Sequence, residues 1–226
     1  MITAHTPPHD VFLNVRKAYR LLHDYQCMVR DGIGYIGSQF DIGYNGWWPR
    51  LPGSAGLDRT KLKISPWDLL EMVFNEFHFV KEIGDNAWLS LSLIVISDSG
   101  FIDGDEKVND KENLSAFAPA DVSSTKFAFI LRKTHWDHLH FMDDKVQMRN
   151  FIRAGGSLPH ELIKREFVGK CYDMTCLTNE AEANKVVSDI IASANERAWP
   201  LELKNSSRGR SIPELHSPNQ PSGIQQ

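Results

Sequence analysis

Three histidines and an aspartate lie within a few residues of one another in the segment Thr134–His140, and side chains of these types bind metal ions. His135, Asp137 and His138 supply the imidazole nitrogens and the carboxylate that zinc and other divalent metals prefer. Asp98, which directly follows an apolar run farther upstream, is a candidate for a further ligand. On this interpretation the protein is a metal-dependent hydrolase, of phosphodiesterase or nuclease type, in which a divalent metal activates water.

The segment Thr134–His138 resembles the metal-binding motif of the metallo-β-lactamase fold, in which His-x-His-x-Asp-His follows a buried strand. The resemblance implies that His135 matches the second histidine, Asp137 the aspartate and His138 the last histidine. Lys133 stands where that motif has its first histidine, so the match is incomplete at a ligand position.

An alternative interpretation of the same segment is an edge strand. Successive side chains of a strand point to opposite faces, so His135 and Asp137 would point one way and Trp136 and His138 the other. An unbent strand therefore separates the candidate ligands. In this alternative Trp136 packs against the body of the protein and no metal is bound.

A second candidate site is the segment Gly32–Gly56, which holds seven of the fifteen glycines among several aromatic residues. Such a composition predicts a long irregular segment whose rings form a contact surface or close the core. We expect the contact residues to be Tyr44, Trp47 and Trp48, with Trp136 beside them. The leading functional hypothesis is therefore a binding protein for another protein or a small ligand that needs no cofactor, while enzymatic activity is left open.

Glycine spacing in this segment also matches the dinucleotide pattern Gly-x-Gly-x-x-Gly, at Gly32, Gly34 and Gly37. That pattern needs a strand before it and a helix after it. Here a helix precedes it, because apolar residues recur at three- and four-residue intervals from Asp10 to Asp31. We therefore expect Asp10 to cap this helix and Gly32 to end it.

Further elements follow from periodicity and from capping residues. A helix is predicted over 66–77, strands over 88–97, 124–132 and 167–174, a short helix over 143–153, and a last helix capped by Asn179 and ended before Pro200. The long connection between the first two strands shows no helical pattern, which disfavours parallel pairing. The predicted fold class is α+β, with a mainly antiparallel or mixed central sheet and helices near both chain ends.

Composition bounds the remaining possibilities. With 42% hydrophobic residues, 24% charged residues and a net charge of -4, the 226-residue chain is ordinary for a globular protein, and nucleic acid is not expected as its main partner. We predict a single domain over 10–203, a flexible N-terminus over 1–9 and a disordered tail rich in Ser, Pro and Gln over 204–226. No signal peptide or membrane-spanning segment is expected. Three cysteines are too few for a disulfide framework, so we expect a cytoplasmic protein.

Overall fold

The computed structural model describes residues 9–49, 74–84, 87–100, 117–134, 150–151 and 167–204. Within these ranges the chain forms two long α-helices, five strands and one short 3-10 helix. In chain order they are α1 (His9–Ser38), β1 (Gly43–Pro49), β2 (Phe74–Gly84), β3 (Ala87–Ile96), β4 (Lys126–Thr134), β5 (Phe167–Asp173), η4 (Met174–Leu177) and α5 (Glu180–Glu196).

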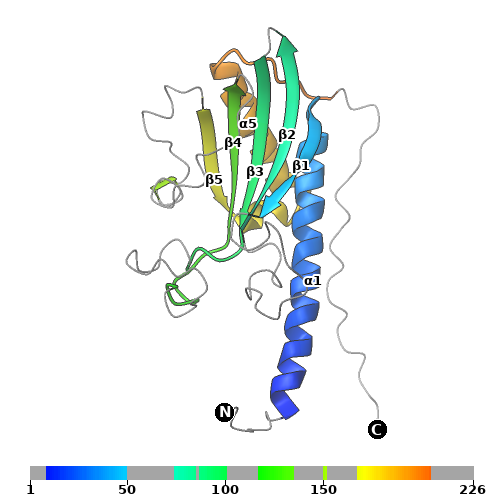
Figure 1. Ribbon diagram of the computed structural model, residues 1–226, viewed down its shortest axis with the longest axis vertical. Helices are drawn as coiled ribbons and strands as arrows, with labels where there is room; N and C mark the ends of the chain where they lie inside the picture. The colour runs from blue at the N-terminus through cyan, green and yellow to red at the C-terminus, as the bar shows by residue number, and fades with distance from the viewer. Residues whose placement is uncertain are drawn as a thin grey trace, which may run out of the picture.

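The five strands form one antiparallel sheet whose spatial order is the same as their order in the chain, β1-β2-β3-β4-β5 (Figure 1). Each strand pairs with the next one along the chain, so parallel crossovers are absent from this sheet. The α+β class and the mainly antiparallel sheet are thus confirmed. The strands predicted over 88–97, 124–132 and 167–174 correspond to β3, β4 and β5, with bounds that differ by two residues at most.

Both long helices lie on the same face of the sheet, which we call the helix face (Figure 1). Alternate side chains of each strand point into the space between this face and the helices, as the pleat of a strand requires. The strand residues that fill this core are Phe77, Phe79, Leu89, Leu91, Leu93, Val95, Phe127, Phe129 and Leu131. The helices contribute residues that include Val29, Ile33 and Ile36 from α1 and Val186 and Ile190 from α5.

α1 is longer than predicted at both ends. It begins at His9, so Asp10 lies in its first turn, and it continues through Gly32 and Gly37 to Ser38. The prediction that Gly32 ends the helix is wrong, and the Gly-x-Gly-x-x-Gly pattern is part of the helix. A Cβ atom on Gly32 would lie 3.1 Å from the Cβ of Leu177, and one on Gly37 would lie 2.2 Å from the Phe79 ring. Glycine therefore lets α1 approach η4 and β2 closely, and this packing offsets its low helix propensity.

The helix predicted over 66–77 is wrong in its last residues, because Phe74 to Phe77 belong to β2. Residues 51–73 lie outside the described part of the chain. Phe77 and Phe79 alternate with His78, and this two-residue period places both rings in the core of the helix face. The three-residue spacing of Phe74 and Phe77, which had indicated a helix, instead puts these two rings on opposite faces of the sheet.

The last helix is confirmed together with its cap. The side-chain oxygen of Asn179 accepts a hydrogen bond of 2.9 Å from the backbone N–H of Glu182 at the start of α5. Tyr35 of α1 donates a hydrogen bond of 2.8 Å to Asn184 of α5, so the two helices are joined by a polar contact as well as by the core. The helix ends at Glu196, ahead of Pro200.

The end of the described chain pairs with the segment between α1 and β1. Phe40 and Leu203 form an antiparallel bridge, and the backbone N–H of Lys204 donates to the carbonyl of Gln39 over 2.8 Å. Lys204, which was predicted to belong to the tail, therefore takes part in an ordered pairing. The rest of the predicted tail, the first eight residues and most of the helix predicted over 143–153 lie outside the described residues; Asn150 and Phe151 are helical.

Candidate functional site

Of the four predicted metal ligands, only Asp98 lies in the described part of the chain. Its Oδ1 atom accepts a hydrogen bond of 2.7 Å from the backbone N–H of Gly100 and thereby closes the turn after β3. A Cβ atom on Gly100 would lie 2.8 Å from Ser123 Oγ and 2.9 Å from the carbonyl of Ala118, so the turn also needs glycine there. This local structural role accounts for one oxygen of the carboxylate.

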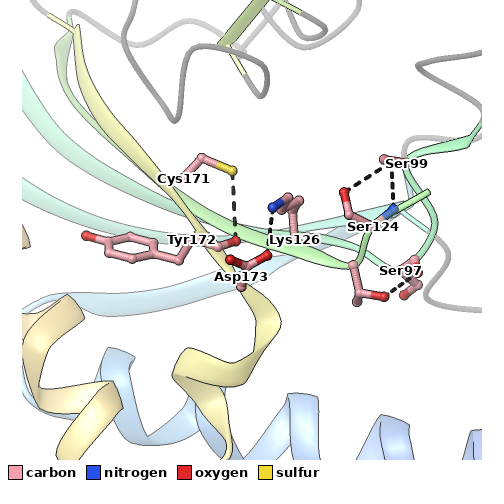
Figure 2. Close-up of polar contacts among 8 residues, drawn as sticks. Ser97, Ser99, Ser124, Lys126, Cys171, Tyr172 and Asp173 are labelled. Carbon is pink, nitrogen blue, oxygen red and sulfur yellow. Dashed lines mark hydrogen bonds and ion pairs between the residues drawn. The ribbon is translucent and has the colours of Figure 1, made fainter. Parts of the chain in front are cut away.

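Hydroxyl groups tie this turn to the start of β4 (Figure 2). The backbone N–H of Ser124 donates to Ser99 Oγ over 3.0 Å, and the Ser124 hydroxyl donates to the same oxygen over 3.2 Å. Thr125 donates to the carbonyl of Ser97 over 3.0 Å. The hydroxyls around Asp98 thus serve to hold two strand ends together, which is a structural use of polar groups.

His135, Asp137, His138 and Trp136 lie outside the described residues, so the metal site and the metal-dependent hydrolase remain predictions. Among the residues whose placement is described, no three His, Cys, Asp or Glu side chains come together as a metal site requires.

The predicted irregular segment is largely regular. Gly32 to Ser38 are helical and Gly43 to Pro49 form β1, the outermost strand of the sheet beside β2. That expectation is therefore wrong for these residues, and residues 50–56 lie outside the described ranges. Two of the predicted contact residues are exposed on this strand: Tyr44 is 56% exposed and Trp47 is 45% exposed. The side chain of Trp48 is not described.

A β-bulge explains why these two rings lie on the same face. The register shifts between Tyr44, which pairs with Phe79, and Gly46, which pairs with His78. Gly46 has a φ of 130°, which side-chain-bearing residues rarely adopt. Because Asn45 is the extra residue, Tyr44 and Trp47 pair with Phe79 and Phe77 and so share the helix face. The Tyr44 ring packs on Phe79 with 5.3 Å between centroids, and partial burial raises the pKa of its hydroxyl.

The first half of α1 carries a second exposed apolar surface. Figure 1 shows this half of the helix running beyond the end of the sheet. Seven large apolar side chains on it are between 37% and 72% exposed: Val11, Phe12, Leu13, Val15, Tyr19, Leu21 and Leu22. Five of them, Val11, Phe12, Val15, Tyr19 and Leu22, recur at three- and four-residue spacing and so share one side of the helix. A contiguous apolar surface marks a contact with another molecule more often than scattered single residues do.

A largely buried polar cluster lies on the face of the sheet opposite the helices, and none of its residues was among the predicted site residues. Its buried members are Glu76 of β2, Ser90 and Ser92 of β3 and Arg132 of β4, and the partly buried His78 of β2 lies among them. His78 Nε2 lies 2.9 Å from Glu76 Oε1, within ion-pair distance, and His78 Nδ1 lies 3.4 Å from Ser92 Oγ. The two serines that interrupt the apolar run of β3 were the only visible signal.

Ser92 contacts His78, and His78 contacts Glu76, which is the arrangement of a serine nucleophile, its base and an orienting acid in a catalytic triad. A nucleophile must reach its substrate, however, and Ser92 is completely buried in the middle of a central strand. The cluster fits a structural role better. A slip of one residue in strand register would turn these polar side chains toward the apolar core of the helix face, so they help to select the observed register.

Neither Cys171 of β5 nor Cys176 of η4 has the lowered pKa that makes a cysteine an activated nucleophile. Cys27, Cys171 and Cys176 are free thiols. Burial raises the pKa of Cys171 to about 11 and that of Cys176 to about 12, so both stay protonated near neutral pH. In Figure 2 the Cys171 thiol donates to the carbonyl of Tyr172, at 4.0 Å.

A known protein family matches most of the chain. The family PM0109 matches residues 6–202, a range that includes every helix and strand described above. The chain belongs to the PM0109 family. Because the match begins before His9, the exposed half of α1 lies within the range that the PM0109 family matches. No curated protein and no solved structure matches the chain.

No membrane-spanning segment was predicted from the sequence, and the helices of the described residues are consistent with that prediction. Neither α1 nor α5 combines the length with the apolarity that a bilayer crossing requires.

Proposed function

We propose that this PM0109 protein is a binding protein and that its partner is an extended segment of another protein, which pairs with the edge of β1. The observation that carries the proposal is the pair of exposed rings, Tyr44 and Trp47, on one face of an edge strand. Extended peptides add to such edges through backbone hydrogen bonds, and alternate side chains give the specificity.

The position of β1 supports this proposal. One edge of β1 pairs with β2, and no other described strand pairs with its second edge, so backbone donors and acceptors there can receive a partner. Pro49 limits the pairing at the end of the strand, because proline has no N–H to donate. Tyrosine and tryptophan are the residues most enriched at energetically important contact positions, since they bury large area at low entropic cost.

Charge and cysteine usage are consistent with a protein partner in the cytoplasm. The net charge of -4 disfavours nucleic acid as the main partner. Three free cysteines without a disulfide are the usual condition of proteins in a reducing compartment.

Peptide display tests the proposal while the partner is still unidentified. Random peptides are selected on the full chain and then measured against Trp47→Ala and against Val122→Ala, a matched change of an exposed apolar residue outside the sheet. We expect Trp47→Ala to weaken binding by about tenfold or more and Val122→Ala to leave it unchanged. Hydrogen exchange should show new protection of β1 amides in the complex. Peptides that bind wild type and Trp47→Ala equally would contradict the proposal.

A further inference from the structure

The exposed half of α1 continues a packing surface that the protein already uses. Val11, Val15, Ala18 and Leu22 follow one another at intervals of four, three and four residues, and the same alternation continues to Tyr25 and Val29. Val29 is fully buried against the core, and Tyr25 is half-buried with its hydroxyl 2.9 Å from Ser97 Oγ. Among the described residues, the body of the protein therefore covers the stripe from Tyr25 onward, and none of them covers it before Tyr25.

Such alternation of four and three residues is the pattern by which one helix packs along another. We propose that the open half of α1 binds the same half of a second copy of the chain, with the two helices antiparallel. This inference concerns a surface separate from β1 and does not depend on the edge-strand proposal.

The charges around the stripe permit contact between two identical helices. The positions flanking it on one side are Phe12 and Tyr19, and those on the other are Asn14 and Leu21, so no charged side chain borders the contact. The cations of this half, Arg16, Lys17 and Arg20, occupy the remaining helix positions. A second copy consequently meets an uncharged surface, and self-association brings no like charges together at the contact.

An antiparallel arrangement is favoured because the body of each copy covers the stripe from Tyr25 onward. In a parallel pair, the part of each α1 from Tyr25 onward would have to pack against the same part of the other copy. That surface is already occupied by the other copy's own η4 and α5. In an antiparallel pair, Val11 of one copy faces Leu22 of the other and Val15 faces Ala18. The N-terminal end of each α1 then lies beside the point where the partner's packed body begins. The contact is two-fold symmetric, as is usual for homodimers.

The available area agrees with a reversible dimer. Burying a whole Val or Leu side chain removes roughly 60–120 Å² from water, and burying an aromatic side chain removes roughly 150–250 Å². Six side chains of this half are about half exposed and together contribute on the order of 300–500 Å² per copy: Val11, Phe12, Val15, Tyr19, Leu21 and Leu22. Two copies would bury on the order of 600–1,000 Å², which is the range of weak, transient contacts rather than of stable interfaces. We therefore expect association that depends on protein concentration in the micromolar range, roughly 1–100 µM.

Sedimentation velocity over a concentration series tests the dimer with the full chain. Wild type should shift from monomer to dimer as the concentration rises. Val15→Glu places a carboxylate in the stripe and should raise the dissociation constant by about tenfold or more, whereas Arg16→Glu on the neighbouring helix position should change it by less than about threefold. Circular dichroism confirms that both variants stay folded. A wild-type chain that remains monomeric at about 300 µM would overturn the proposal, as would equal effects of the two variants.

Disulfide trapping tests the orientation in a Cys27→Ser background. Val15→Cys and Ala18→Cys should cross-link efficiently only when the two variants are mixed, because residue 15 of one copy faces residue 18 of the other. Efficient cross-linking of either variant with itself would contradict the antiparallel pair. Binding of wild type, but not of Val15→Glu, to anionic lipid vesicles without any dimer formation would assign the stripe to a membrane surface and overturn the proposal.

Discussion

Replacing Gly37 with alanine should destabilise the protein, although alanine is the better helix former. A Cβ atom at this position would lie 2.2 and 2.3 Å from two carbons of the Phe79 ring, well inside the ordinary contact distance of about 3.5–4 Å. Phe79 is 6% exposed and lies in a packed core, so its ring has little room to move. Overpacking of this kind costs about 1–3 kcal/mol, which exceeds the gain of about 0.5–1 kcal/mol in helix propensity.

Two other glycines of the same helix provide the controls. A Cβ atom on Gly34 would have no neighbouring atom within 4 Å, so Gly34→Ala should stabilise the protein by about 0.5–1 kcal/mol. A Cβ atom on Gly32 would lie 3.1 Å from Leu177, and Gly32→Ala should fall between the two. Urea denaturation followed by tryptophan fluorescence gives the free energy of unfolding of each variant. If Gly37→Ala proved as stable as Gly34→Ala, α1 would not approach β2 as described.

Three further substitutions or conditions test other parts of the fold. Burial raises the pKa of Cys171 to about 11 and that of Cys176 to about 12. The contribution of these two thiols to the free energy of unfolding should therefore be complete below about pH 9 and be lost as the pH rises toward these values. Urea titrations across this pH range should show a steeper loss of stability in wild type than in the Cys171→Ala and Cys176→Ala double variant. Asn179→Ala should lower the free energy of unfolding by about 1 kcal/mol, and Asn179→Ser should restore most of it, because serine also accepts from a helix N–H. His78→Leu should lower the free energy of unfolding by about 1–3 kcal/mol, since it removes the imidazole whose Nε2 lies 2.9 Å from Oε1 of the buried Glu76 side chain. The Glu76→Leu/His78→Leu pair should cost less than His78→Leu alone in thermal unfolding.

Local periodicity was sufficient to predict the fold class and most of the sheet. β3 has an apolar residue at every second position along its whole length, and β4 has the same alternation from Phe127 to Leu131. Asn179 with Glu182 forms a capping pattern that depends on a few neighbouring residues. The errors arose where a distant contact decides the local structure. Gly32 and Gly37 remain helical because Leu177 and Phe79 pack against them, and neither contact can be read from the helix sequence itself.

The candidate sites show the same limit. Tyr44 and Trp47, which were predicted as contact residues, are exposed, but their common orientation depends on the bulge at Asn45, which only the register with β2 reveals. The apolar stripe of α1 was visible as a pattern from Val11 to Val29. That its first half extends beyond the sheet depends on where the body of the protein ends, which periodicity does not indicate.

The central claim is that α1 is divided at about Tyr25 into a packed half and a half reserved for another protein chain. Hydrogen–deuterium exchange along α1, measured on dilute and on concentrated full-length protein, tests this claim most directly. We predict that amides of residues 26–38 are protected at every concentration, while amides of residues 11–22 exchange rapidly in dilute solution and become protected as the concentration rises. Rapid exchange of residues 11–22 at all concentrations, or equal protection of both halves in dilute solution, would contradict the claim.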